Sequence, residues 1–90
     1  MDAPAPGTIT MFSTTWCGYC KRLKSALQRE GIGYTEVNIE EVPEAADYVM
    51  SVNEGRRSVP TLEYGGGAAS LSRFTPAKLA DFLSRSGAQG

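Results

Sequence analysis

Histidine is absent from this sequence of 90 residues, and cysteine occurs only twice. Without histidine, the chain lacks the Ser-His and Cys-His pairs that activate many enzymatic nucleophiles, and it lacks every zinc or haem site that needs an imidazole. An excess of charge of one sign is also missing, because nine Lys and Arg residues stand against ten Asp and Glu residues. This balance does not favour nucleic acid or an anionic membrane as a partner.

Long apolar runs are missing too, since no stretch reaches the roughly 18 residues that a membrane-spanning helix needs. The first residues, Met1–Gly7, contain an acid and two prolines where a signal peptide has a cation and an apolar core. We therefore expect a soluble, cytoplasmic protein in which residues 1–7 form a disordered tail. With 41% hydrophobic residues the chain can bury one core, and we expect a single, monomeric domain over residues 8–87.

Hydrophobic periodicity predicts an α/β fold with the element order βαβαββα. Alternating β-branched and aromatic residues predict strands at 8–13, 34–39, 59–64 and 68–73, the first of them buried mainly on one face. Apolar residues three and four apart predict helices from the turn at 14–18 to Gly31, from Pro43 to about Asn53, and from Pro76, capped by Thr75, to Gly87.

The connections between these elements predict how the sheet is arranged. A strand-helix-strand run of this length favours parallel pairing of the first two strands, and Gly65–Gly67 favours a hairpin between the last two. The result is a four-stranded mixed sheet flanked by three helices. We expect Tyr48 and Tyr64 in the core, and residues 71–74 completing the sheet and packing onto the last helix.

The two cysteines, Cys17 and Cys20, stand where the first strand ends and the first helix begins. The first N–H groups of a helix have no intrahelical partner, so they can stabilise a thiolate at Cys17, with Lys21 and Arg22 adding positive charge one turn on. Residues three apart on a helix have Cβ atoms about 5 to 6 Å apart, so Cys20 can close a disulfide. This pattern predicts Cys17 as an exposed nucleophile and Cys20 as the resolving thiol.

Other uses of a close cysteine pair are weaker here. A structural disulfide would close a four-residue loop and would stabilise the fold by roughly 2 kcal/mol or less. A zinc site within one chain needs two more Cys or His ligands, which the sequence does not contain. A zinc ion or an iron–sulfur cluster shared between two chains is compatible with the ligand count. Redox chemistry is the favoured interpretation, and no metal is expected in the monomer.

Several features together resemble the thioredoxin superfamily. They are the element order, the Cys-x-x-Cys at the start of the first helix, and Val59-Pro60 before the third strand. One strand alone precedes Cys17, which fits a protein of glutaredoxin size. The sequence Trp-Cys-Gly-Tyr-Cys at 16–20 is similar to the motif of the mycoredoxins, glutaredoxin-like proteins of bacteria that use mycothiol. Ser-Val-Asn at 51–53 and Ser-Val-Pro-Thr at 58–61 resemble that family as well.

This resemblance implies a thiol-disulfide oxidoreductase that reduces mixed disulfides between mycothiol and proteins. Mycothiol is then a co-substrate, no cofactor is tightly bound, and electrons come from NADPH through a separate mycothione reductase, because the chain has no Gly-x-Gly-x-x-Gly. Mycothiolated proteins are the expected substrates.

The resemblance also implies a set of thiol-binding residues. Val59-Pro60 is expected to be a cis peptide next to Cys17, with Val59, Pro60 and Thr61 in the thiol-binding surface. Tyr19 and Trp16 would flank the thiol and stack on a bound partner, although Trp16 fits a half-buried edge residue equally well. Independently of the resemblance, Arg56 and Arg57 are candidates for binding the glycine carboxylate of glutathione, although the interpretation that they are solvated loop charges is favoured.

The sequence departs from glutaredoxins that use glutathione. Those proteins place Pro-Tyr between the cysteines and follow a Gly-Gly segment with acidic residues, whereas here Gly65–Gly67 is followed by Ala-Ala-Ser-Leu-Ser-Arg. The free amine of glutathione would find no carboxylate there, while mycothiol has none to pair. Two alternatives stay open: a dithiol donor served by glutathione or thioredoxin reductase, and a dimer that binds an iron–sulfur cluster.

Overall fold

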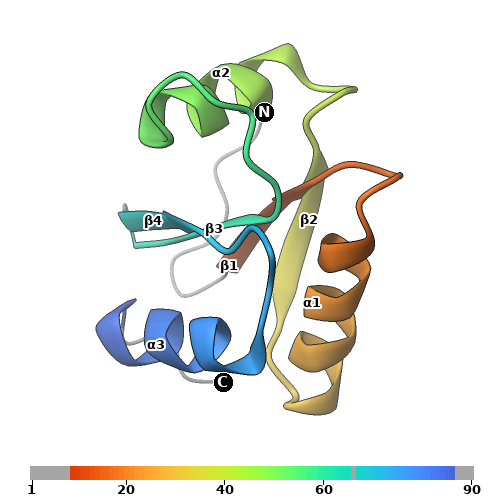
Figure 1. Cartoon of the computed structure of the whole chain (residues 1–90), viewed down its shortest axis with the longest axis vertical. Coiled ribbons are helices and arrows are strands. Elements are labelled where there is room, and N and C mark those ends of the chain that lie inside the picture. The colour runs from red at the N-terminus through yellow and green to blue at the C-terminus, as the bar shows by residue number, and fades with distance from the viewer. Residues whose placement is uncertain (1–8, 66, 87–90) are drawn as a thin grey trace.

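The computed structural model describes residues 9–65 and 67–86, which follow the expected βαβαββα order (Figure 1). The expected tail at 1–7, Thr8 and Gly87 lie outside the described residues. The strands are β1 (Ile9–Ser13), β2 (Tyr34–Asn38), β3 (Thr61–Tyr64) and β4 (Gly67–Ser70), and the helices are α1 (Gly18–Arg29), α2 (Pro43–Val52) and α3 (Pro76–Ser86).

The four strands form one mixed sheet in the order β2-β1-β3-β4. β1 pairs with β2 in parallel and with β3 antiparallel, and β3 and β4 form the expected antiparallel hairpin. One core cluster joins β1 and β3 to α1 and α3, and a second joins β1 to α2. The sheet is therefore flanked by three helices, as expected, with two of them on one face and one on the other.

β1 is buried along its whole length, which corrects the expectation of a strand buried mainly on one face. Ile9 and Met11 pack in the cluster with α1 and α3, whereas Phe12 packs in the cluster with α2 and lies 5.2 Å from the Tyr48 ring. Alternate side chains of a strand point to opposite faces, so a central strand covered on both sides buries all of them. Tyr48 and Tyr64 are half-buried at the margin of the core instead of inside it.

The hairpin of β3 and β4 is shorter than its hydrophobic pattern predicts. β3 begins at Thr61 because Pro60 has no N–H to pair with a neighbouring strand. β4 ends at Ser70, so the expectation that residues 71–74 complete the sheet is wrong. Leu71 and Phe74 are instead buried in the cluster that contains α3. These two residues connect the sheet to α3 by packing, as expected, without belonging to a strand.

The residues at the N-termini of α1 and α3 explain where these two helices begin. α1 begins at Gly18 with Cys17 as its N-cap and buries Cys20, Leu23, Ala26 and Leu27 along one stripe. In α3, Thr75 Oγ1 accepts a hydrogen bond from the Lys78 N–H over 3.4 Å, and Pro76 follows at the first helical position. Among the described helices, none has the length and apolar character that a membrane span requires.

Candidate active site

Cys17 lies in the loop between β1 and α1, at the N-cap of α1. Its backbone is extended, with φ −85° and ψ 110°, and its Sγ accepts a hydrogen bond from the Cys20 N–H over 3.1 Å. A serine or aspartate at an N-cap uses its side-chain oxygen in the same way. The sulfur therefore occupies the position where the start of the helix stabilises negative charge, as the sequence predicts.

The exposure of Cys17 differs from the expectation. The residue is 6% exposed, so it is buried, because its Sγ turns inward toward Cys20 and toward the Val59 carbonyl oxygen, 4.0 Å away. Both cysteines are free thiols in the structure.

Cys20 lies within the first turn of α1 and is 1% exposed. Burial raises the pKa of the Cys20 thiol to about 12, with a further contribution from its contact with Cys17. A contact with the Thr14 backbone opposes this rise in pKa without cancelling it. At neutral pH Cys20 is therefore a protonated thiol, and the two sulfurs of the pair are chemically distinct.

The loop before β3 carries the expected cis peptide bond between Val59 and Pro60. The Val59 carbonyl faces Cys17, and Val59 itself is half-buried. Thr61 is fully buried, its hydroxyl donating to the Ser58 carbonyl over 2.7 Å. The Thr61 side chain thus supports this loop from behind and does not lie in the surface beside Cys17.

Sequence reasoning did not identify Asn53 as part of the site. Its Nδ2 donates to the Val49 carbonyl at the end of α2 over 2.8 Å and to Thr61 Oγ1 over 3.2 Å. Asn53 therefore connects α2 to the loop that carries Val59 and Pro60. The signal in the sequence was the Ser-Val-Asn at 51–53, which the resemblance singled out without a structural role.

Two aromatic side chains lie next to the cysteines in the sequence and are exposed. Trp16 is 71% exposed, which excludes a half-buried edge position, and its Nε1–H donates to Glu40 Oε2 over 3.1 Å. Tyr19 is 42% exposed, with the Arg22 guanidinium 5.7 Å from the centre of its ring. Both side chains are available to contact a bound molecule. Glu40 was not anticipated, because it lies 24 residues from Trp16.

Arg57 lies exposed in the loop that leads to Val59. Neither a hydrogen bond nor an ion pair connects its side chain to another described residue. Within the described residues, therefore, no hydrogen bond or ion pair links the Arg57 side chain to Cys17 or Cys20.

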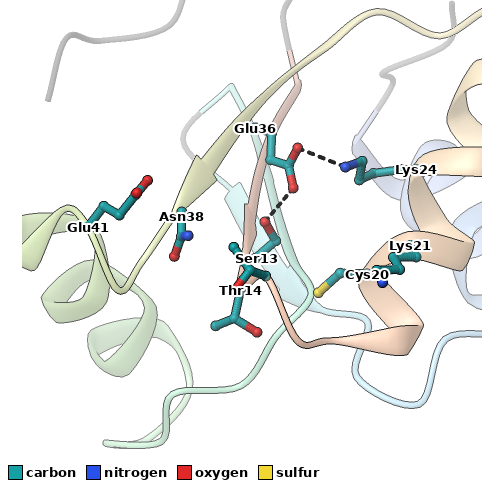
Figure 2. A pocket seen from close by; sticks show the side chains of 9 residues that line it. Ser13, Thr14, Cys20, Lys21, Lys24, Glu36, Asn38 and Glu41 are labelled. Carbon is teal, nitrogen blue, oxygen red and sulfur yellow. Dashed lines mark hydrogen bonds and ion pairs between the residues drawn. The ribbon is translucent and has the colours of Figure 1, made fainter.

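A pocket of about 410 Å³ lies on the side of Cys20 toward β2 (Figure 2). Glu36 of β2 accepts a hydrogen bond from Ser13 Oγ over 2.7 Å and forms an ion pair with Lys24 Nζ of α1 over 3.2 Å. The Ser13 hydroxyl lowers the pKa of Glu36, and Lys24 lowers it further. The lining residues are Ser13, Thr14, Thr15, Cys20, Lys21, Lys24, Glu36, Asn38 and Glu41.

Within residues 9–65 and 67–86, no cluster of three or more Cys, Asp or Glu side chains is arranged to hold a metal ion. A metal or cluster bound through Cys17 and Cys20 would therefore need ligands from outside this part of the chain.

Comparison with known proteins agrees with this geometry. A sequence model of the glutaredoxin family matches residues 9–68. A protein of Mycobacterium tuberculosis H37Rv that bears the name putative glutaredoxin is 50% identical over 60 residues, which is 67% of this chain and 71% of that protein. Mycoredoxin 1 of Corynebacterium glutamicum is 39% identical over 59 residues, 66% of this chain and 72% of its own.

Solved structures give the same result for the fold. The glutaredoxin-like NrdH-redoxin of Escherichia coli superposes with a TM-score of 0.62 at 28% identity, covering 70% of this chain and 80% of its own. The chain therefore belongs to the glutaredoxin family and is a thiol-disulfide oxidoreductase whose Cys-x-x-Cys pair is Cys17 and Cys20.

Proposed function

We propose that this protein reduces mixed disulfides between mycothiol and proteins, with Cys17 as the nucleophile and Cys20 as the resolving thiol. The observation that supports these roles is the asymmetry of the pair. Cys17 Sγ accepts the Cys20 N–H at the start of α1, whereas burial keeps the Cys20 side chain protonated. The thiolate is the reactive form in thiol-disulfide exchange, so Cys17 attacks first.

The proposed reaction exchanges one disulfide bond at a time. The Cys17 thiolate attacks the mycothiol sulfur, the bond between mycothiol and the protein breaks, and the substrate leaves as a thiolate that takes a proton from water. Cys17 then carries mycothiol. A second mycothiol thiolate attacks the bound mycothiol sulfur, restoring Cys17 and releasing mycothiol disulfide. An NADPH-dependent mycothione reductase would reduce that product, and we place the protein in the reducing cytoplasm for this reason.

The choice of mycothiol rests on two observations. One relative carries the name mycoredoxin 1 and is 39% identical to this chain. In addition, residues 67–73 carry no carboxylate of their own, and the Asp81 carboxylate of α3, which lines a pocket with residues 67–71, is paired with Arg85 instead of being free for a ligand amine. Mycothiol has an acetylated amine and sugar hydroxyls, and the exposed face of Trp16 offers a surface on which it can stack.

A coupled assay tests this proposal. A protein carrying a mycothiol mixed disulfide is mixed with the enzyme, free mycothiol, NADPH and mycothione reductase. NADPH consumption is then compared with that in a parallel system that contains glutathione, glutathione reductase and the corresponding glutathione mixed disulfide. We expect faster turnover with mycothiol, none with Cys17→Ser, and retained turnover with Cys20→Ser. Equal or faster turnover with glutathione would contradict the choice of thiol, and a dead Cys20→Ser variant would require a dithiol cycle.

A second candidate is a dithiol donor that thioredoxin reductase recharges. The likeness to NrdH-redoxin favours it, because that protein has a thioredoxin-like activity profile. In this case the oxidised Cys17–Cys20 disulfide would be the substrate of the reductase. NADPH oxidation by thioredoxin reductase, with this protein as electron acceptor, is the distinguishing measurement.

A further inference from the structure

The pocket beside Cys20 brings a fixed negative charge to the same cavity as the resolving thiol. Figure 2 shows Cys20 on α1 and Glu36 on β2 lining this one pocket. Both carboxylate oxygens of Glu36 are anchored, Oε2 by Ser13 Oγ and Oε1 by Lys24 Nζ. The carboxylate is therefore held in place at the wall of the pocket instead of moving freely in solvent.

Charged and titratable groups reach this pocket from three parts of the fold. α1 contributes Lys21 and Lys24 as well as Cys20, β2 contributes Glu36, and the segment after β2 contributes Glu41. Cys17 also contacts Cys20 directly.

Burial and the contact with Cys17 are the main causes of the raised pKa of Cys20, and the charge of Glu36 adds a smaller contribution that also favours the protonated form. A glutamate is ionised at neutral pH, and Ser13 and Lys24 lower the pKa of Glu36 below its ordinary value, so its negative charge is present at the pH of the reaction.

We propose that Glu36 restrains Cys20, keeping it as a thiol so that the mixed disulfide on Cys17 survives long enough for a second small thiol to attack it. This inference rests on the proposed roles of Cys17 and Cys20. Lys24 offsets the restraint, because its ammonium is paired with the same carboxylate. Glu36 is thus a positioning residue that acts through Cys20 and shifts the balance from a dithiol cycle toward a monothiol cycle.

The restrained step is the closure of the internal disulfide. Cys20 gives its proton to water and its thiolate attacks Cys17 Sγ. The Cys17–Cys20 bond forms, the bond between Cys17 and the adduct breaks, and the adduct leaves as a thiolate. The adduct sulfur is reduced and Cys20 is oxidised, so no further reductant is required. The rate of this step is proportional to the fraction of Cys20 that is ionised, which a nearby carboxylate lowers.

The disulfide reagent dithiobis(nitrobenzoate) reports the reaction rates of both cysteines in one experiment. The reduced protein releases a first coloured nitrobenzoate thiolate when Cys17 attacks the reagent, and a second when Cys20 attacks the Cys17 adduct. Near pH 7 we expect Glu36→Gln to speed the second release by about three- to tenfold. The substitution removes one negative charge near Cys20, partly screened by solvent, and so increases the ionised fraction of Cys20. Lys24→Met should slow the second release, because it leaves the carboxylate without its counter-ion.

These two variants separate an electrostatic role from a structural one. Both break the same ion pair, so loss of a structural contact would change the second release in the same direction in both. Opposite changes support the restraint. A slower or unchanged second release in Glu36→Gln, with the first release intact, would overturn it.

Three controls complete the experiment. Glu41→Gln removes another carboxylate at the same pocket and should leave the second release unchanged. Cys20→Ser should release a single equivalent. A failure of the proposed function would be seen in a different variant, Cys17→Ser. If Cys17 is the nucleophile, this variant loses the first release. A fast first release in Cys17→Ser would instead show that Cys20 is the nucleophile.

Discussion

The backbone N–H of Cys20 donates a hydrogen bond to Cys17 Sγ over 3.1 Å, so one cysteine of the pair stabilises charge on the sulfur of the other. The same residue keeps its own thiol buried within the first turn of α1. This arrangement follows directly from the spacing of the motif, because a residue at the N-cap accepts a hydrogen bond from the residue three positions later. The geometry of this single helical turn supports the proposal that Cys17 is the nucleophile and Cys20 the resolving thiol.

Alkylation of the single-cysteine variants tests this assignment. In Cys20→Ser, we expect iodoacetamide to react with Cys17 at neutral pH. In Cys17→Ser, the reaction of Cys20 should be slow and should rise about tenfold with each pH unit into the alkaline range, because burial, the largest cause of the raised pKa of Cys20, is unchanged in this variant. Reaction of Cys20 alone at neutral pH would reverse the two roles.

Substitution of Asn53 tests whether its hydrogen bonds stabilise the loop that contains the cis Val59-Pro60 peptide. Asn53→Ala removes hydrogen bonds to the Val49 carbonyl and to Thr61 Oγ1, which leaves Thr61 buried with one partner fewer. We expect the free energy of unfolding in urea to fall by about 1 to 3 kcal/mol. Ser51→Ala is the matched control, because its exposed hydroxyl bonds the Tyr48 carbonyl and its loss should cost less. Equal losses in both variants would contradict the role of Asn53.

Much of the site was accessible from the sequence because its signals are local. Cys17 and Cys20 share one helical turn, and glycines and prolines mark the ends of the elements around them. The cis bond at Val59-Pro60 came from family resemblance, since propensity alone assigns cis to about 5 to 6% of such bonds.

The remaining parts of the site depend on contacts between distant residues. Glu36 and Ser13 are 23 positions apart and meet through the register in which β1 and β2 pair. The sequence predicts that these strands are parallel, but no periodicity reveals the register. Nor does any periodicity reveal the contact between Trp16 and Glu40. The hydrophobic pattern of residues 71–74 was misleading for a different reason. Leu71 and Phe74 bury their side chains against α3 without strand pairing, and burial alone does not distinguish the two cases.

The lowered pKa of Glu36 makes a prediction about acid stability. A carboxyl whose pKa is lower in the folded state stabilises the fold fully above its unfolded pKa, about 4.3 for glutamate, and loses this contribution as the pH falls through the lower folded pKa. Glu36→Gln should therefore destabilise the protein near neutral pH, and the difference from the unsubstituted protein should shrink in acid. Urea unfolding at a series of pH values measures this.

Glu41→Gln serves as the comparison for this experiment, since it neutralises an exposed carboxylate at the same pocket. A difference for Glu36→Gln that stayed constant from neutral pH to well below pH 4 would show that the Ser13 and Lys24 contacts do not couple proton binding at Glu36 to folding.

The hydrogen bond between Trp16 and Glu40 predicts a change in both fluorescence and substrate binding. Trp16 is the sole tryptophan of the chain, so its emission reports on this side chain alone. In Glu40→Ala the indole loses its partner, and we expect lower fluorescence anisotropy together with a higher KM for the mycothiolated substrate and a nearly unchanged kcat, because the cysteines are untouched. An aromatic contact contributes about 0.5 to 1.5 kcal/mol, so Trp16→Ala should raise KM about two- to tenfold.

Glu40→Gln keeps an oxygen acceptor and should stay close to the unsubstituted protein in both measurements. A fall in kcat with KM unchanged would instead mean that Trp16 acts on the reactivity of Cys17 and not on binding of the substrate.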